Sequence, residues 1–214
     1  MGLLQNLGIV RGDDTLAGKI FEDLFPSFFE VEYVKPVDYV KIYWDAYLVF
    51  REGSNLNEQQ QRSVNGKIFE YILATLLIRE NILPIFLSSK VAFVPNISYD
   101  LMLYSTDRGP ICLSAKTSFR ERYKQADLEA IALKYVHRRS LCYLLTLSEK
   151  DANDVNKKQI IGDVIGLDKA IFVLSEDFND LVNELKSFNL TESPNVNIIE
   201  STQIITLNKV NSVL

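Results

Sequence analysis

The sequence predicts an α/β protein in which a mixed central β-sheet is flanked by helices. Short apolar runs of strand length alternate with longer segments whose apolar residues repeat at the helical period. A tight turn joins two of these runs, so we expect them to pair as antiparallel strands. A helix joins the second run to a third, so we expect those two strands to be parallel, which makes the sheet mixed.

Length and composition set the limits of this fold. The chain has 214 residues, of which 47% are hydrophobic and 24% are charged, enough for a single domain over residues 1–214. We divide it into an N-terminal helical and aromatic region, residues 1–55, and a core, residues 56–214. No stretch approaches the roughly 18 to 20 apolar residues of a membrane span, so we expect a cytoplasmic protein with no membrane partner.

The N-terminal region combines a short helix with many aromatic side chains. Residues 13–26 begin with helix-capping acids and end at a proline, which predicts an amphipathic helix. Residues 28–50 hold eight aromatic side chains. Core packing is the simpler explanation for them, because aromatics are the commonest large buried groups.

A long helix is expected from Glu58 to about Glu80. Its wide buried face consists of Ile68, Phe69, Ile72, Leu73, Leu76 and Leu77. Glu70 lies away from the centre of this face. It is either a solvated glutamate or a group that supports a site, and the sequence favours neither interpretation.

Two strands then form a hairpin. The apolar run 101–104 follows Asp100, the turn 106–110 contains Gly and Pro, and the next run, 111–113, leads to Lys116. Antiparallel pairing brings the start of the first strand to the end of the second, so we expect Asp100 and Lys116 to lie at one edge of the sheet.

The next helix is expected from about Arg120 to Arg139. Its predicted buried stripe is Leu128, Ile131, Ala132 and Tyr135. This places Arg122, Gln125 and Glu129 on its flank, from which Glu129 can approach Lys116. Two carboxylates and a lysine would therefore converge.

The remaining elements complete the sheet. We expect a strand at 141–146, a helix at about 148–160, short strands at 162–165 and 170–174, a helix at 177–188, and edge strands at 196–199 and 204–206. Cys112 and Cys142 each lie inside an apolar run, which predicts buried, reduced thiols in neighbouring strands.

Two carboxylates beside a lysine suit metal-assisted hydrolysis of a phosphodiester. Asp100 and Glu129 are hard oxygen ligands of the kind that bind Mg²⁺, whose remaining positions are filled by water and phosphate oxygens. Lys116 would orient the attacking water and offset the charge that develops in the transition state. The segment 116–139 is locally basic although the chain has a net charge of −5, which suits a partner such as double-stranded DNA.

These residues resemble a known nuclease core. Asp100, the sequence Ser114-Ala-Lys116 and Glu129 are similar to the PD-(D/E)xK motif of type II restriction endonucleases of the CCGG/CCNGG group, which includes EcoRII, PspGI and NgoMIV. In that group a small residue, here Ser114, replaces the second acid, and the next helix supplies the carboxylate. Tyr99 precedes Asp100, so the proline of the motif is absent locally.

The resemblance also implies how DNA would be bound. The sequence Arg120-Glu121-Arg122 resembles the element with which those enzymes recognise adjacent C·G pairs, and Lys124 belongs to the same basic segment. Arginine can donate two bonds to guanine, and glutamate can accept one from cytosine. Residues 65–70 resemble the helix whose glutamate supports the metal site in many relatives, which makes Glu70 a fourth catalytic candidate.

The implied function is that of a Mg²⁺-dependent endonuclease of a restriction–modification system, which cleaves both strands of a short, palindromic sequence containing CC/GG. A symmetric target predicts a homodimer, and a cognate DNA methyltransferase is expected in the same system. Residues 1–55 would serve dimerisation or DNA contact, with Trp44 a candidate for stacking on an unpaired base.

Three alternatives stay open. The same fold could serve repair or recombination and recognise DNA structure instead of sequence. Lys116 and Glu129 could also be only an ion pair in a non-catalytic DNA-binding module. An enzyme acting on a small phosphate ranks last, because the sequence has no GxxxxGK[ST] loop.

Overall fold

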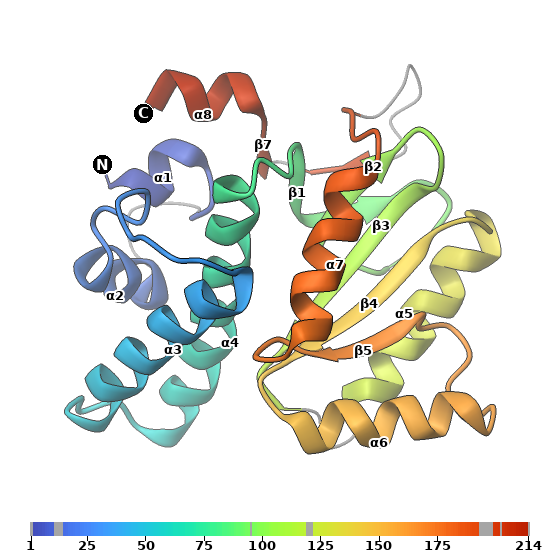
Figure 1. Ribbon diagram of the computed structural model, residues 1–214, viewed down its shortest axis with the longest axis horizontal. Coiled ribbons are helices and arrows are strands. Elements are labelled where there is room, and N and C mark those ends of the chain that lie inside the picture. Colours follow the sequence, from blue (N-terminus) through green and yellow to red (C-terminus); the bar gives the residue numbers. More distant parts are fainter. Residues whose placement is uncertain are drawn as a thin grey trace.

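The computed structural model describes residues 2–10, 15–94, 96–118, 122–192, 199–201 and 203–213. A central sheet runs through them, with helices on both sides (Figure 1). In spatial order its strands are β5 (Lys169–Phe172), β4 (Leu141–Thr146), β3 (Gly109–Lys116), β2 (Tyr99–Ser105), β1 (Ile85–Val91) and β6 (Ile199–Glu200), with β7 (Gln203–Ile205) also paired with β1. The predicted α/β fold with a mixed sheet is confirmed.

The sheet is antiparallel at one side and parallel at the other. Strands β1, β2 and β3 form an antiparallel meander in which Leu101 pairs with Leu113. Gly109 closes the β2–β3 turn with φ +80°, a conformation that glycine adopts without steric cost. Strands β3, β4 and β5 are parallel, and Cys112 pairs with Cys142. Both thiols are buried and free, as predicted.

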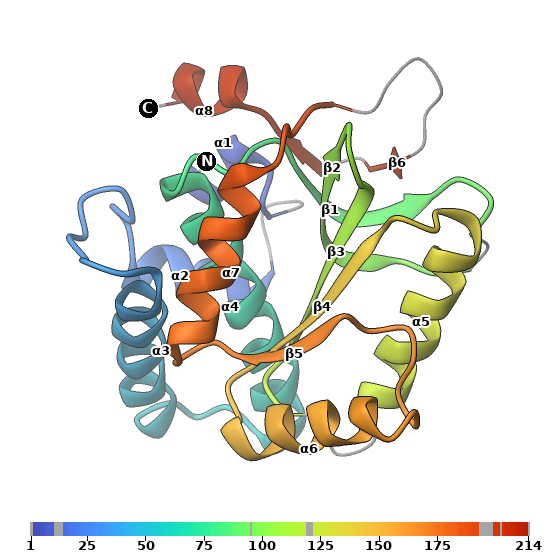
Figure 2. The same cartoon turned by 45° about the vertical axis from the view of Figure 1, so that its right-hand side comes forward.

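Eight helices surround this sheet in the described ranges. They are α1 (Leu3–Leu7), α2 (Leu16–Leu24), α3 (Pro36–Glu52), α4 (Glu58–Arg79), α5 (Arg122–Val136), α6 (Glu149–Ile160), α7 (Glu176–Ser187) and α8 (Leu207–Val213). Helices α3, α4 and α7 lie on one side of the sheet, and α5 and α6 lie on the other (Figure 2). Within these ranges no helix is long and apolar enough to cross a membrane.

Each side of the sheet has its own apolar core. Alternate strand residues point to opposite faces, so Leu101 and Leu113 pack with α4 whereas Met102 and Cys112 pack with α5 and α6. Most of the residues predicted for the buried face of α4 are nearly inaccessible, and the helix is capped by Asn57, whose side chain accepts from the Gln60 backbone N–H.

The aromatic side chains of α3 belong to the first of these cores. Tyr39, Tyr43 and Tyr47 are fully buried. Trp44 is half-buried, and its ring lies edge-on to that of Phe69 at 6.1 Å between centroids. Core packing therefore accounts for these residues, as the simpler explanation predicted.

The buried face of α5 differs from the prediction. Leu128 and Tyr135 are exposed, at 66% and 87%, and the helix instead buries Ala126, Ala130 and Leu133. Small side chains let a helix backbone approach the sheet closely, and this fit outweighs the greater hydrophobic area of the larger residues. The predicted stripe of Leu128, Ile131, Ala132 and Tyr135 was therefore wrong.

Residues 162–165 are also not the strand that was predicted. They belong to the loop between α6 and β5, and this loop is fixed by α5. The Asp127 carboxylate accepts from the backbone N–H groups of Ile165, Gly166 and Leu167, which takes up donors that a strand would use. Gly166 lies so close to α5 that an added Cβ would stand 2.4 Å from the Asp127 carbonyl oxygen.

Two other predicted elements have shifted bounds. The first helix, predicted from residue 13, is observed as α2 from Leu16, with the Thr15 side chain as its cap; residues 13 and 14 lie outside the described ranges. Of the predicted strand 196–199, only residue 199 is described, and it begins β6.

Candidate active site

Asp100 and Lys116 meet at one edge of the sheet, as predicted. Asp100 is the second residue of β2 and Lys116 is the last residue of β3. The Lys116 ammonium donates to Asp100 Oδ2 at 2.6 Å, and the Ala115 backbone N–H donates to the same oxygen at 3.2 Å. Both side chains are about one-fifth exposed, so the pair is shielded but open to a substrate.

Glu129 approaches this pair from α5. Its carboxylate accepts from the Gln125 amide at 2.7 Å, and its carbonyl oxygen accepts from the Tyr99 hydroxyl at 3.0 Å. Burial raises the pKa of the Glu129 carboxyl, and the Asp100 carboxylate raises it further, although Gln125 and Lys116 partly offset both effects. Glu129 thus lies within electrostatic reach of both Asp100 and Lys116.

Glu70 approaches from α4, on the opposite side of the sheet. Its side chain is only 19% exposed, so it is not the solvated glutamate of the alternative interpretation. Burial raises the pKa of its carboxyl, and Asp100 adds to this effect, while Lys67 and Lys116 lower the pKa. The Asp100–Lys116 pair therefore influences one glutamate from each helical layer.

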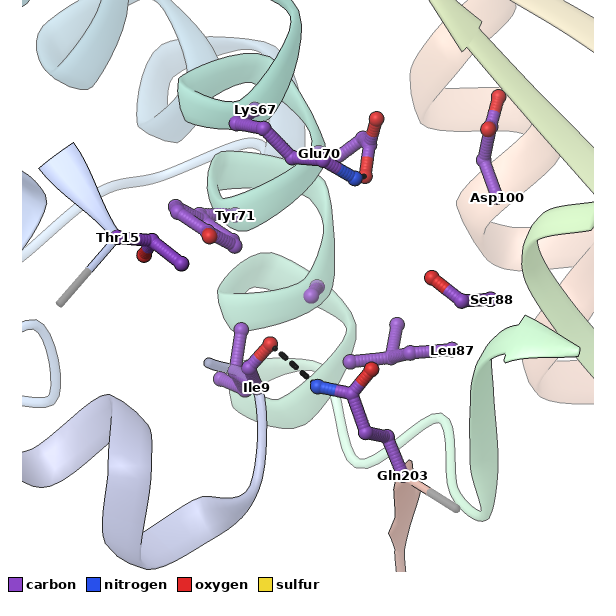
Figure 3. A pocket seen from close by; sticks show the side chains of 10 residues that line it. Ile9, Thr15, Lys67, Glu70, Tyr71, Leu87, Ser88, Asp100 and Gln203 are labelled. Carbon is purple, nitrogen blue, oxygen red and sulfur yellow. Dashed lines mark hydrogen bonds and ion pairs between the residues drawn. The ribbon is translucent and has the colours of Figure 1, made fainter. Parts of the chain in front are cut away.

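A pocket of about 170 Å³ opens between α4 and the start of β2. Figure 3 shows Lys67 and Glu70 on one side of it and Asp100 on the other. Ser88 also lines this pocket, with φ +46°, an uncommon conformation for a residue other than glycine. The pocket is smaller than the roughly 300–1,000 Å³ typical of sites that enclose a whole small molecule.

The N-terminal segment forms another wall of this pocket. Ile9 and Thr15 line it, and Gln203 of β7 fastens the segment in place. The Gln203 Nε2 group donates to the carbonyl oxygens of Gly8 and Ile9, both at 3.0 Å (Figure 3 shows the second bond). A residue near the end of the chain therefore holds the beginning of the chain against the pocket.

The carboxylates fit a hard divalent cation that shares its ligands with water and substrate. Within the ranges that the structure describes, no three His, Cys, Asp or Glu side chains form a closed metal site. Mg²⁺ is commonly held by one or two carboxylates and completed by water and phosphate oxygens. Asp100 lines the pocket, and Glu129 is near enough for the Asp100 charge to contribute to the raised pKa of its carboxyl.

The candidate DNA-binding residues are described only in part. Arg120 and Glu121 lie outside the described residues. Arg122 begins α5, and both it and Lys124 are exposed in the first turn of this helix. Their helix also carries Glu129, so a contact made by Arg122 would be coupled to the position of the carboxylate.

Sequence analysis missed Lys67, Ser88 and Gln203. Lys67 could have been noticed, because it lies three residues before Glu70 and residues at this spacing share a helix face. Ser88 sits inside an apolar strand whose unusual backbone has no sequence signature. Gln203 contacts Gly8 across 195 positions of the chain, which no local pattern reveals.

Comparison with known proteins adds evidence on the fold. No family model and no curated protein matches the chain. Among solved structures it is similar to the restriction endonuclease PspGI in complex with its substrate DNA, with a TM-score of 0.55 and 17% sequence identity over 92% of this chain and 87% of that chain. The chain therefore has a restriction endonuclease-like fold.

Proposed function

We propose that this protein is a Mg²⁺-dependent endodeoxyribonuclease that cleaves both strands of duplex DNA at a short, palindromic sequence containing CC/GG. The observation that carries the proposal is the contact of 2.6 Å between Lys116 and Asp100, with Glu129 within electrostatic reach. The likeness to a restriction endonuclease whose solved structure contains DNA supports the same activity. The small volume of the pocket favours a large substrate that inserts one group.

Each residue of the proposed site has a separate task. Asp100 and Glu129 would hold the Mg²⁺ ion, which would supply Lewis-acid polarisation of the scissile phosphate and activation of a water. Lys116 orients the attacking water and offsets the negative charge that develops on the phosphate. Glu70 adds a carboxylate from α4 that can accept a hydrogen bond from water in the pocket.

We assign recognition to residues 120–124, of which Arg122 begins α5 and residues 120 and 121 lie outside the described ranges. Arg120 and Arg122 would each donate to a guanine, and Glu121 would accept from a cytosine in the major groove. Lys124 would bind the DNA backbone, which contributes affinity but no sequence preference. A two-fold symmetric target is bound most simply by a homodimer, in which each subunit supplies one α5 and one site. A cognate methyltransferase would protect the host sequence.

The test uses plasmid DNA, Mg²⁺ and a matched pair of lysine variants. Lys116→Met removes the lysine of the site. Lys134→Met removes a lysine that is equally shielded, 24% exposed against 21%, and paired with Asp168 at 2.8 Å. Lys134 lies on the same helix as Glu129. Because Lys134→Met also breaks a shielded ion pair, it controls for the general cost of such a loss.

We expect the wild type and Lys134→Met to give discrete fragments whose ends share one sequence, and Lys116→Met to give none. Sequencing the fragment ends would also identify the target. Fragments with unrelated ends would indicate a nuclease that recognises DNA structure. An intact plasmid together with undiminished DNA binding would instead indicate a non-catalytic binding module.

A further inference from the structure

Lys67 lines the pocket, and the catalytic motif does not contain it. It lies one turn before Glu70 on α4, and its ammonium donates to Glu70 Oε2 at 2.6 Å. Both residues line the pocket together with Asp100. In Figure 3 the Lys67 ammonium lies beside the Glu70 carboxylate, on the side of α4 that faces Asp100.

The surroundings of Lys67 keep it charged. Burial alone would lower the pKa of its ammonium, but Glu70, Tyr71 and Asp100 outweigh this effect and raise the pKa above its usual value. An ammonium has three N–H donors, and the bond to Glu70 uses one of them. The Lys67 side chain can therefore keep its bond to Glu70 and donate a second hydrogen bond to another acceptor.

Exposure distinguishes the roles of the two lysines. The Lys67 side chain is 47% exposed, whereas that of Lys116 is 21% exposed and held by Asp100. Lys67 is thus the more accessible of these two lysines. Glu70 and Asp100 line the pocket with Lys67, so without Lys67 two carboxylates would face a ligand there with no basic side chain in the lining to offset them.

We propose that Lys67 binds a backbone phosphate of the DNA, the one adjacent to the scissile phosphate, and so draws the strand into a pocket that is otherwise acidic. This inference rests on the proposed nuclease function, but it assigns a contact that the motif residues do not provide. The chemistry is a charge-assisted hydrogen bond from an ammonium to a non-bridging phosphate oxygen. No bond is made or broken by Lys67.

A phosphate contact has a signature that does not depend on cleavage. Each neutralised phosphate contributes about 0.9 to the slope of log binding constant against log salt concentration. We would measure this slope with Ca²⁺ in place of Mg²⁺, so that the duplex stays intact. The probe is a 30-base-pair duplex that carries the target found in the plasmid assay, or an arbitrary sequence if no target is found.

Lys67→Met should reduce the slope by about 0.9, whereas Lys67→Arg should retain it because the charge is kept. Arg62→Met is the matched control, since Arg62 lies on the same helix but is 69% exposed and paired with Glu58. It should leave the slope unchanged. Thermal unfolding of each variant verifies that the fold is retained.

One further variant separates phosphate binding from simple neutralisation of Glu70. If Lys67 binds phosphate, Lys67→Met should lower the slope in a Glu70→Gln background as well. If its effect disappears in that background, Lys67 serves only Glu70 and the inference is overturned.

The outcomes also separate this inference from the proposed function. If the wild type cleaves plasmid and Lys67→Met keeps the full salt slope, the inference on Lys67 is overturned and the proposed nuclease function stands. A wild type that binds with the expected slopes but never cleaves supports Lys67 as a phosphate ligand and removes the catalytic proposal. A wild type that binds no DNA at low salt overturns both.

Discussion

The ammonium of Lys116 lies 2.6 Å from Oδ2 of Asp100, although 16 positions separate the two residues in the chain. The β2–β3 hairpin brings them together, and the Ala115 backbone N–H fixes the orientation of the carboxylate by donating to the same oxygen. Both donors use Oδ2, so Oδ1 is the oxygen that could bind a cation. In the proposed site, Oδ2 would hold Lys116 and Oδ1 would bind the cation.

Asp100→Asn should abolish cleavage and destabilise the fold. Removing the charge deprives the Lys116 ammonium of its anionic partner, which should lower the free energy of unfolding by about 1–3 kcal/mol in chemical denaturation. Asp168→Asn is the control, because Asp168 likewise accepts from a lysine, Lys134, and from a backbone N–H, that of Cys142. It should cost similar stability and leave cleavage intact; equal loss of cleavage in both variants would remove Asp100 from the site.

Glu70→Gln should stabilise the protein at neutral pH. The pKa of the Glu70 carboxyl is raised in the folded protein, so the folded state binds more protons than the unfolded chain and the free energy of unfolding falls as pH rises through this window. Glutamine removes that dependence. The advantage of the variant should therefore be absent below the pKa of an ordinary carboxyl, grow as pH rises from that value to the raised pKa, and stay constant above it.

Denaturation of both proteins at several pH values measures this difference. Glu58→Gln serves as its control, because the Glu58 side chain is 88% exposed on the same helix. A Glu70→Gln variant that is less stable than the wild type at neutral pH would show that the bond to Lys67 outweighs the cost of burial.

Glu129→Gln should raise the Mg²⁺ concentration needed for half-maximal cleavage. A neutral amide is a weaker ligand for a hard cation than a carboxylate. The measurement is cleavage rate against Mg²⁺ concentration, starting from protein treated with a chelator, which should be inactive until Mg²⁺ is added. Glu149→Gln, an exposed acid in the first turn of α6, should not change the curve. An unchanged curve for Glu129→Gln would leave Glu129 without a metal-binding role.

Gln203→Leu should impair cleavage through the wall of the pocket. It leaves the carbonyl oxygens of Gly8 and Ile9 without their donor and loosens the N-terminal segment, at a cost of about 1–3 kcal/mol in stability. Gln159 is a close match, since its Nε2 donates to the carbonyl oxygens of Leu167 and Asp168 at 2.9 and 2.8 Å. Gln159→Leu should therefore lose stability but keep the wild-type cleavage rate per molecule of folded protein.

Arg122→Ala should relax the choice of sequence. Loss of a bidentate contact to guanine should cost about 1–3 kcal/mol of discrimination at one base pair, measured as the ratio of cleavage rates on target and single-substituted duplexes. Arg120→Ala should act at a neighbouring pair. Equal losses on target and random DNA would reduce either arginine to a phosphate contact.

The parts of the fold that were predictable have strong local patterns. The long helix α4, the hairpin of β2 and β3, and β4 follow from apolar periodicity and turn residues, and the hairpin alone brought Asp100 to Lys116. The buried face of α5 was not predictable in this way. The contact of α5 with the sheet depends on how closely Ala126 and Ala130 let the two backbones approach each other. A prediction from hydrophobic periodicity gives more weight to large apolar side chains.

The candidate site was predictable to the same extent. The hairpin geometry was sufficient to bring Asp100 and Lys116 together. The position of Glu129 was inferred from a buried stripe of α5 that the structure does not have. Lys67 and Gln203 depend on how α4 and the two ends of the chain pack around the sheet, which is a property of the tertiary structure. The wall of the pocket therefore appeared only in the structure.

Gly166 gives a loop remote in sequence an influence on the site. Its backbone rests against α5, whose position sets where both Glu129 and Arg122 lie. A methyl group at residue 166 would have to push that helix outward, because the two atoms nearest to it belong to the helix backbone. The lack of a side chain at Gly166 thus lets α5 take the position at which it carries both Arg122, proposed to recognise DNA, and Glu129, proposed to support cleavage.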